Sequence, residues 1–484
     1  MKWLLLIALL PVVLSQHVGQ QKTEEPLPIT WQECNSPGSC SDVQGAVVLD
    51  SNWRWTHIVD DYVNCYTGNE WDPEYCPDAA TCTENCAIDG VDAADWESTY
   101  GGATNGAELS LKFVSEGPYS RNVGSRTYLL DEDLTNYRMF NLLNKEFTFD
   151  VNDAELGCGL NGALYFVEML ADGGLSEYDT NEAGAQYGTG YCDAQCPHDV
   201  KWINGEANME EWSPSETDEN AGFGKYGSCC GEMDIWEANS QSQAYTSHPC
   251  TIESQYRCEG TECGDNASDE RYDGVCDKDG CDYASFRLGD QTFWGPGSEF
   301  TVDSSQVVTV VTQFITADGT DTGELIEIRR KYVQNGNVIE NSVMNIDGFE
   351  AYDSITEDFC QNYKVAFNDY DDHTIKGGLK VMGESLARGH VLVMSLWDDH
   401  EANMLWLDSN YPPGNYDNNY EQYYLHDIYN IIKHILPDCD TDVPGCARGP
   451  CPEDSGLPSD VESEQGDSTV YFSNIKFGCI DCTY

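Results

Sequence analysis

Short apolar segments separated by turn-forming clusters of Gly, Asn and Asp recur along the whole chain and constrain its fold more than any other feature. Several of them alternate apolar and polar residues, which is typical of β-strands. Many short strands at close spacing predict an all-β protein, a large β-sandwich of jelly-roll type. The clearest segments are 45–50, 108–114, 125–130, 146–151, 163–168, 307–314, 390–396 and 469–472.

A single domain is expected, although 484 residues could form about three domains of roughly 150 residues each. No Pro/Ser/Thr-rich linker divides the chain, and no internal repeat is visible. Long loops between strands account for the length. We therefore assign residues 16–484 to one domain.

One stretch departs from the strand pattern. Apolar residues from Glu421 to Leu436 have helical spacing, which predicts a helix inside a surface insertion at residues 410–447. Two interpretations remain open. The helix packs its apolar face on the sandwich, or it acts as a lid or contact surface.

The first 15 residues have the features of a signal peptide. Lys2 provides the positive charge, residues 3–14 form an apolar run, and Ser15 is a small residue at the expected cleavage point. The run is shorter than the about 20 residues that cross a bilayer, and no later stretch is long and apolar enough. A secreted, extracellular protein is expected.

Cysteine content and charge exclude several classes of protein. In an oxidising compartment, 22 cysteines indicate disulfides rather than a zinc site. Because 85 acidic residues outnumber 24 basic ones, for a net charge of −61, the chain would repel nucleic acids and anionic membranes. With 12 Trp and 28 Tyr, it is too aromatic for a disordered acidic protein.

Three carboxylates within six residues are the strongest candidates for chemistry. Alternation along a strand places Glu232 and Asp234 on one face, and a one-residue bulge after Asp234 would bring Glu237 to the same face. Carboxylates that repel one another have at least one raised pKa. Glycoside hydrolysis needs such a pair, one acid and one carboxylate. A solvated acidic strand without catalytic function remains the alternative.

The segment Glu232–Asn239 resembles the active-site motif of glycoside hydrolase family 7, the family of cellobiohydrolases and endoglucanases. The resemblance covers nearly the whole mature chain and includes residues 51–57, 158–167, 187–193, 395–399, 402–408 and 472–478. It implies a concanavalin-like sandwich whose long loops form a substrate tunnel or cleft. It also implies a nucleophile at Glu232, an acid/base at Glu237, a residue that tunes the nucleophile at Asp234, and no metal or organic cofactor.

The resemblance also implies a set of sugar-binding residues. Flat indole rings stack on the apolar faces of a glucan without fixing one hydrogen-bond pattern, so a chain can slide over them. The implied platforms are Trp53, Trp55, Trp397 and Trp406, with Trp55 at the far entrance. Asn161, Tyr165 and Gln195 match residues beside the reacting sugar. On the leaving-group side the matching residues are His248, Arg271, Asp279 and Arg448.

Nine disulfides are implied in the same way. They are Cys34–Cys40, Cys65–Cys86, Cys76–Cys82, Cys158–Cys451, Cys192–Cys230, Cys196–Cys229, Cys250–Cys276, Cys258–Cys263 and Cys281–Cys360. For the remaining four cysteines we expect pairing between neighbours, Cys439 with Cys446 and Cys479 with Cys482.

The long loops 212–222 and 263–273 favour a processive cellobiohydrolase that releases cellobiose from reducing ends. An endo-β-1,4-glucanase is the alternative, because Ala267 and Glu401 stand where fungal members often place two tyrosines across the tunnel. A catalytically silent glucan-binding protein is a further alternative. The expected partners are cellulose and cellobiose, and the expected state is a monomer. Asn266 begins the one glycosylation sequon identified.

The charge predicts salt tolerance. Salt at physiological strength or above shortens the Debye length to about 8 Å or less, which weakens repulsion between surface carboxylates. We expect the melting temperature to rise from low to moderately high NaCl. A melting temperature that falls over that range in a thermal-denaturation series would contradict the prediction.

Overall fold

The computed structural model describes residues 15–117, 120–265, 270–411 and 445–484. The predicted signal peptide, apart from Ser15, lies outside these residues. The predicted helix at 421–436, Cys439 and the sequon at Asn266 also lie outside them.

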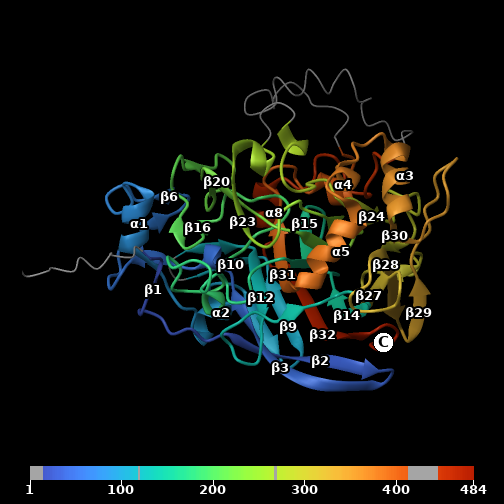
Figure 1. Ribbon diagram of the computed structural model, residues 1–484, viewed down its shortest axis with the longest axis horizontal. Coiled ribbons are helices and arrows are strands. Elements are labelled where there is room, and N and C mark those ends of the chain that lie inside the picture. Colours follow the sequence, from blue (N-terminus) through green and yellow to red (C-terminus); the bar gives the residue numbers. More distant parts are fainter. Residues whose placement is uncertain (1–14, 118–119, 266–269, 412–444) are drawn as a thin grey trace, which may run out of the picture.

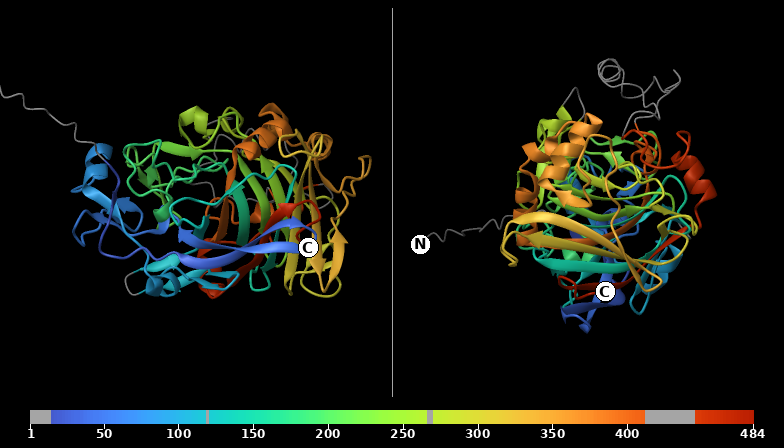
Figure 2. Two further views of the ribbon diagram at one scale, coloured as in Figure 1. Left: turned by 60° about the horizontal axis from the view of Figure 1, so that its bottom comes forward. Right: turned by 90° about the vertical axis from the view of Figure 1, so that its right-hand side faces the viewer.

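Most strands belong to one network of 17 strands that folds into two layers (Figures 1 and 2). The first layer pairs its strands in the order β3 (Ser39–Leu49), β12 (Ser125–Leu130), β31 (His390–Asp398), β15 (Leu160–Val167), β21 (Glu232–Ala238), β22 (Gln243–His248) and β24 (Cys281–Ala284), with β13 (Met139–Phe140) on β31.

The second layer packs against the first across the main core. Its order is β8 (Gly102–Asn105), β9 (Glu108–Lys112), β32 (Thr469–Cys479), β14 (Lys145–Asn152), β27 (Val308–Thr316) and β28 (Leu325–Gln334), with β29 (Asn337–Glu340) and β30 (Ser354–Thr356) on β28. Strand β2 (Leu27–Ser36) joins the layers, because it pairs with β3 and also with β32. The β2–β3 hairpin runs along the lower edge of Figure 1.

The predicted all-β sandwich is therefore confirmed, and each of the eight predicted segments coincides with a strand. Strand β32 continues beyond its predicted end to Cys479, pairing with β14. The sequence analysis missed the helices α3 (Glu357–Phe367) and α5 (Gly378–Arg388), although Leu379, Met382 and Leu386 repeat at helical spacing and are buried.

Smaller elements decorate the sandwich. The remaining helices are α1 (Ala79–Asn85), α2 (Ala93–Ser98), α4 (Asp372–Ile375), α6 (Leu405–Asp408) and α8 (Pro458–Glu464). The short strands are β1 (His17–Val18), β4 (Thr56–Ile58), β5 (Tyr66–Thr67), β6 (Glu70–Trp71), β7 (Cys86–Ile88), β10 (Val114–Glu116), β11 (Arg121–Val123), β16 (Trp202–Ile203), β17 (Glu206–Ala207), β18 (Ser213–Pro214), β19 (Gly222–Phe223), β20 (Tyr226–Cys229), β23 (Tyr256–Glu259), β25 (Trp294–Gly295) and β26 (Val302–Asp303).

Strand β15 shows how the sandwich divides its side chains between two faces. Leu164 and Phe166 enter the main core between the layers, where Trp236 of β21 packs edge-on against Phe149 of β14. The intervening residue Tyr165 points to the opposite face of the first layer, where a second apolar cluster lies under the loops. This outer face of the first layer is called the concave face below. The alternation of the strand places Asn161 on it as well as Tyr165.

Ten disulfides join the described residues. All nine pairs implied by the resemblance are present, and so is Cys479–Cys482. Cys446 forms no disulfide with another described residue, and its expected partner Cys439 lies outside them. Pairing of these two cysteines stays a prediction.

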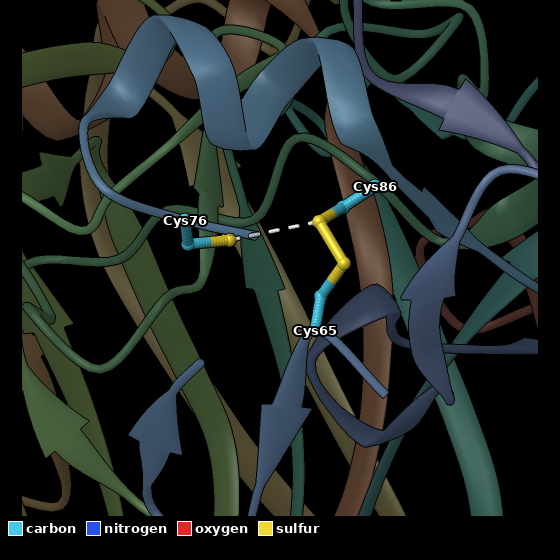
Figure 3. A group of neighbouring side chains, drawn as sticks. All are labelled: Cys65, Cys76 and Cys86. Carbon is cyan, nitrogen blue, oxygen red and sulfur yellow. Dashed lines mark hydrogen bonds between the residues drawn. A yellow bond between two sulfur atoms is a disulfide. The ribbon is translucent and has the colours of Figure 1, made fainter. Parts of the chain in front are cut away.

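Two of the disulfides lie against each other at the end of the molecule that carries α1 (Figure 1), and Figure 3 shows Cys76 of one beside the Cys65–Cys86 bridge of the other. Cys76 Sγ, bonded to Cys82, lies 3.6 Å from Cys86 Sγ, which is bonded to Cys65. These bridges hold the segment 56–88 together, although its strands β4 and β7 pair with each other rather than with the main sheet. Among the described residues, no helix is both long and apolar enough to cross a membrane.

A disulfide should stabilise the protein more when it closes a longer loop, with a logarithmic dependence on loop length. Cys281–Cys360 joins residues 79 apart, and Cys34–Cys40 joins residues 6 apart. Loop-closure entropy predicts that removing the longer bridge costs about 2 kcal/mol more free energy of unfolding. We expect the double Cys→Ala variant at 281 and 360 to melt at a lower temperature than the one at 34 and 40. Equal melting temperatures for the two variants would contradict this ranking.

Candidate active site

Strand β21 carries the three carboxylates, and a bulge aligns them. Asp234 pairs with Tyr165 of β15, whereas Glu237 pairs with Ala163, so β21 has one residue more than its neighbour in this interval. The same register shift occurs against β22. As expected from the spacing, the bulge brings Glu237 to the face of Glu232 and Asp234. Met233 and Trp236 point the other way into the main core.

Glu232 is buried at one end of this row. Its Oε2 accepts a hydrogen bond from the main-chain N–H of Ala194 at 2.9 Å. Burial, with the charges of Asp234 and Asp193, raises the pKa of Glu232 well above its ordinary value. The Ala194 N–H acts in the opposite direction, because it stabilises the ionised carboxylate.

Glu237 lies at the other end and contacts Asn161 on β15. Asn161 Nδ2 donates to Glu237 Oε1 at 3.1 Å, and its Oδ1 accepts the N–H of Ala238 at 3.0 Å. Burial and the negative charge of Asp234 raise the pKa of Glu237 to about 8. Glu237 is therefore protonated at neutral pH and is able to donate a proton.

Asp234 lies between them and is paired with a histidine. His248 Nε2 lies 3.2 Å from Asp234 Oδ2, and His248 Nδ1 lies 2.8 Å from the carbonyl oxygen of Asp277. Both ring nitrogens face acceptors, so the ring has to carry two protons to satisfy both contacts. Burial disfavours the charged ring, but the hydrogen bond and charge of Asp234 outweigh it and raise the pKa of His248 to about 9.

A network that the sequence analysis missed lies under Glu232. Tyr165 Oη and Tyr191 Oη are 2.9 Å apart, and Tyr191 Oη donates to Asp193 Oδ2 at 2.6 Å. The guanidinium of Arg126 lies 3.3 Å from the centre of the Tyr191 ring, and its Nε lies 2.6 Å from Asp50 Oδ2. Tyr191 and Asp193 belong to the matched segment 187–193, and Arg126 is one of only 24 basic residues. Neither observation predicts the contact between Arg126 and Tyr191.

The predicted platforms lie in two places. Trp397 is paired with Asn161 across β31 and β15, and its ring stacks with that of Trp406 at 6.3 Å and 29°. The structure therefore places Trp397 opposite Asn161, the residue that contacts Glu237. The other two platforms lie elsewhere. Arg126 lies 5.2 Å from the centre of the Trp53 ring. Trp55 directly precedes β4, in the segment whose disulfides also hold α1.

The remaining predicted residues lie on the side of His248. Gln195 Nε2 donates to the carbonyl oxygen of Lys278 at 2.8 Å. Arg271 forms an ion pair with Asp279 at 2.7 Å. Although burial opposes ionisation, Arg271 lowers the pKa of Asp279 to about 2. The Arg448 guanidinium lies 5.6 Å from the Tyr411 ring, and its buried Nε has no hydrogen-bond partner among the described residues.

One hydrogen bond joins two long loops. His400 Nδ1 lies 2.8 Å from the carbonyl oxygen of Thr217. The loop 212–222 leads through β20 to the Glu232 end of β21, whereas residues 399–404 follow the end of β31 beside Asn161 and Trp397. The contact therefore joins a loop that precedes β21 in the sequence to a loop that follows β31.

The comparison with known proteins decides the family. The model of glycosyl hydrolase family 7 matches residues 18–424 and 426–484. The chain belongs to this family. The residue-level resemblance seen in the sequence is thus confirmed over almost the entire protein.

Individual family members are similar over their full lengths. The chain is 54% identical over 476 residues to exoglucanase GH7B of Limnoria quadripunctata, covering 98% of each protein. It matches the crystal structure of a cellobiohydrolase of the family from Daphnia pulex with a TM-score of 0.91 and 57% identity, covering 97% of this chain and 100% of that one. The cellobiohydrolase from Melanocarpus albomyces, complexed with cellotetraose, matches with a TM-score of 0.85 and 42% identity over the same shares.

Proposed function

We propose that the protein is a secreted cellobiohydrolase that cleaves β-1,4-glucosidic bonds of cellulose with retention and releases cellobiose from reducing ends. The observation that carries this proposal is the row of Glu232, Asp234 and Glu237 on one face of a bulged strand, the first two buried and Glu237 partly buried. Family membership and the exoglucanase and cellobiohydrolase names of similar proteins support it. The working form is proposed to be a monomer.

The carboxylates take different roles in the proposed mechanism. Glu237 holds a proton at neutral pH and donates it to the departing glycosidic oxygen. Glu232, whose charge is stabilised by the Ala194 N–H, attacks the anomeric carbon and forms a glycosyl-enzyme. Glu237 then removes a proton from water, which attacks the same carbon and releases Glu232. Two displacements at the anomeric carbon leave its configuration unchanged, and no cofactor takes part.

Asp234 and His248 set the charge of the group. Three adjacent carboxylates with no cation would favour the uptake of more than one proton, because their charges repel. The imidazolium of His248 balances the charge of Asp234. Glu232 and Glu237 are then left to share one proton between them, which is the state that double displacement requires at the start.

Substrate binding is proposed to follow the indole rings and the polar groups around them. Trp55, Trp53, Trp397 and Trp406 form platforms for successive sugars, with Asn161, Tyr165 and Gln195 around the reacting one. Arg271, Asp279, His248 and Arg448 surround the departing cellobiose, where charged groups hydrogen-bond to its hydroxyls. A neutral glucan pays no electrostatic cost on approaching a chain of charge −61.

The contact between loops favours the exo mode over the endo mode. Two long loops joined by His400 and Thr217 would restrict entry from the side and keep a bound chain in place. Such a chain is then cleaved repeatedly from one end. An endo-β-1,4-glucanase remains the second candidate, since Glu401 and Ala267 do not provide the pair of facing tyrosines.

Replacing each glutamate in turn should separate the two roles. Glu237→Gln should lower kcat/KM on cellulose by about 10²–10⁴, because the leaving sugar is no longer protonated. With an aryl cellobioside whose leaving group needs no proton, the first half-reaction should persist as a burst of aryl product. Turnover after the burst should be slow, because nothing deprotonates water. Stopped-flow absorbance measures both phases.

Glu232→Gln is the matched control of equal shape. It should abolish both the burst and turnover while cellulose binding survives, because no glycosyl-enzyme can form. In the pH profile of wild-type kcat/KM, the apparent pKa of the basic limb should lie above the ordinary pKa of a glutamic acid. The reason is that the protonated form of Glu237 is the active one and its pKa is raised. Unchanged activity of Glu232→Gln would contradict the mechanism.

Removing the loop contact should shift the mode of attack. His400→Ala loses one hydrogen bond, worth about 1 kcal/mol, so the loop should open about fivefold more often. We expect more insoluble reducing ends relative to soluble ones on crystalline cellulose. His17→Ala, which removes a histidine bonded to Glu182 in the N-terminal segment, is the control. An equal product ratio for both variants would show that the contact does not limit side entry.

A further inference from the structure

Tyr62 is the most exposed aromatic side chain among the described residues. Of the other large apolar side chains described, only Val365 is equally exposed. The exposed fraction of Tyr62 is 71%, and that of its neighbour Val63 is 40%. Single exposed apolar residues need no explanation. Tyr62 differs because of what lies beside it.

The ring of Tyr62 lies next to that of Trp55. Their centres are 5.9 Å apart, and the rings are tilted by 35°. Trp55 is the implied platform at the far entrance, so Tyr62 extends this aromatic surface outward. No other described aromatic ring packs against Tyr62.

The turn that carries Tyr62 is held firmly. The N–H of Ile58 donates to the carbonyl of Val63 at 2.8 Å, and that of Asp61 donates to the carbonyl of Ile58 at 3.0 Å. The Asp61 carboxylate accepts the Tyr62 N–H at 2.6 Å. The turn is then anchored by Cys65, which is bonded to Cys86.

Trp55 is fixed to the same turn. Its Nε1 donates to Asn64 Oδ1 at 2.7 Å, and its ring stacks on that of His57 at 4.0 Å. His57 is itself held by Asp89 at 2.8 Å. The Trp55 ring and the backbone that carries Tyr62 therefore keep their relative position, which limits the conformational entropy lost when a ligand binds.

We propose that Tyr62 is a sugar-binding platform outside the entrance, which together with Trp55 takes up a β-1,4-glucan chain as it leaves the cellulose surface. The inference rests on the proposed function, since it uses Trp55 as the entrance platform. An aromatic face binds the apolar face of a sugar, whereas Asp60 and Asp61 on the same turn would repel an anionic ligand. The ligand is therefore an uncharged glucan.

Adsorption to crystalline cellulose in the cold tests this inference, with every variant made in the Glu232→Gln background so that binding is read without turnover. Tyr62→Ala should adsorb about three- to tenfold more weakly, because one ring face no longer leaves water. Tyr62→Phe should adsorb like the parent, since it keeps the ring. Tyr62→Trp, with a larger face, should adsorb at least as strongly.

Tyr484→Ala is the matched control. It removes another exposed tyrosine, at the C-terminus, where its hydroxyl contacts Lys331 and Asp481. The inference is overturned if Tyr62→Ala adsorbs like the parent, if Tyr62→Phe or Tyr62→Trp is as weak as Tyr62→Ala, or if Tyr484→Ala is equally weak. Because the side chain of Tyr62 is largely exposed, its replacement by alanine should leave folding intact, and equal melting temperatures of the variant and its parent check this.

Turnover of an aryl cellobioside by the wild-type protein tests the proposed function separately. If the wild-type protein has no such activity but Tyr62→Ala still adsorbs more weakly, the hydrolase proposal fails and the glucan platform stands. If activity is present but adsorption does not depend on the ring at position 62, the hydrolase proposal stands and the platform is overturned.

Discussion

The close approach of three carboxyl groups on one strand is the constraint on which the rest of the site depends. Glu232, Asp234 and Glu237 repel one another at short range in a weakly screened environment. One cation, His248, balances Asp234, and main-chain and amide groups hold the other two carboxyls. The remaining repulsion keeps a proton on the pair at neutral pH, which is what acid-assisted attack on a glycosidic bond uses.

This arrangement requires a rigid support, which the sandwich supplies. The bulge in β21 turns Glu237 toward the concave face while Trp236 stays in the core against Phe149. Close packing between the two layers fixes the bulge in β21, because a change of register would move Trp236 out of the core. Disulfides also hold the segment that presents Trp55 and Tyr62, where their cysteines pack in an apolar cluster with Tyr66 and Trp71.

Features that depend on neighbouring residues could be predicted from the sequence, and features that depend on distant ones could not. Alternation identified β12, β14, β15 and β31, because side-chain direction in a strand repeats every two residues. The odd spacing of Glu237 required a bulge, and the bulge is present. In contrast, nothing in the sequence showed that Arg126 would lie between Asp50 and Tyr191, or that His400 would meet Thr217, since these partners are far apart along the chain.

The sequence by itself determined the fold class, the three carboxylates on one strand and, through its resemblance to a family, nine of the disulfides and the family itself. Local periodicity and fixed spacing carry that information. Only the tertiary structure decided which groups tune Glu232 and Glu237, which loops touch, and that Tyr62 lies beside Trp55. The physical reason is that pKa values, loop contacts and exposed ring surfaces are set by atoms brought together in space, and chain order does not record those distances.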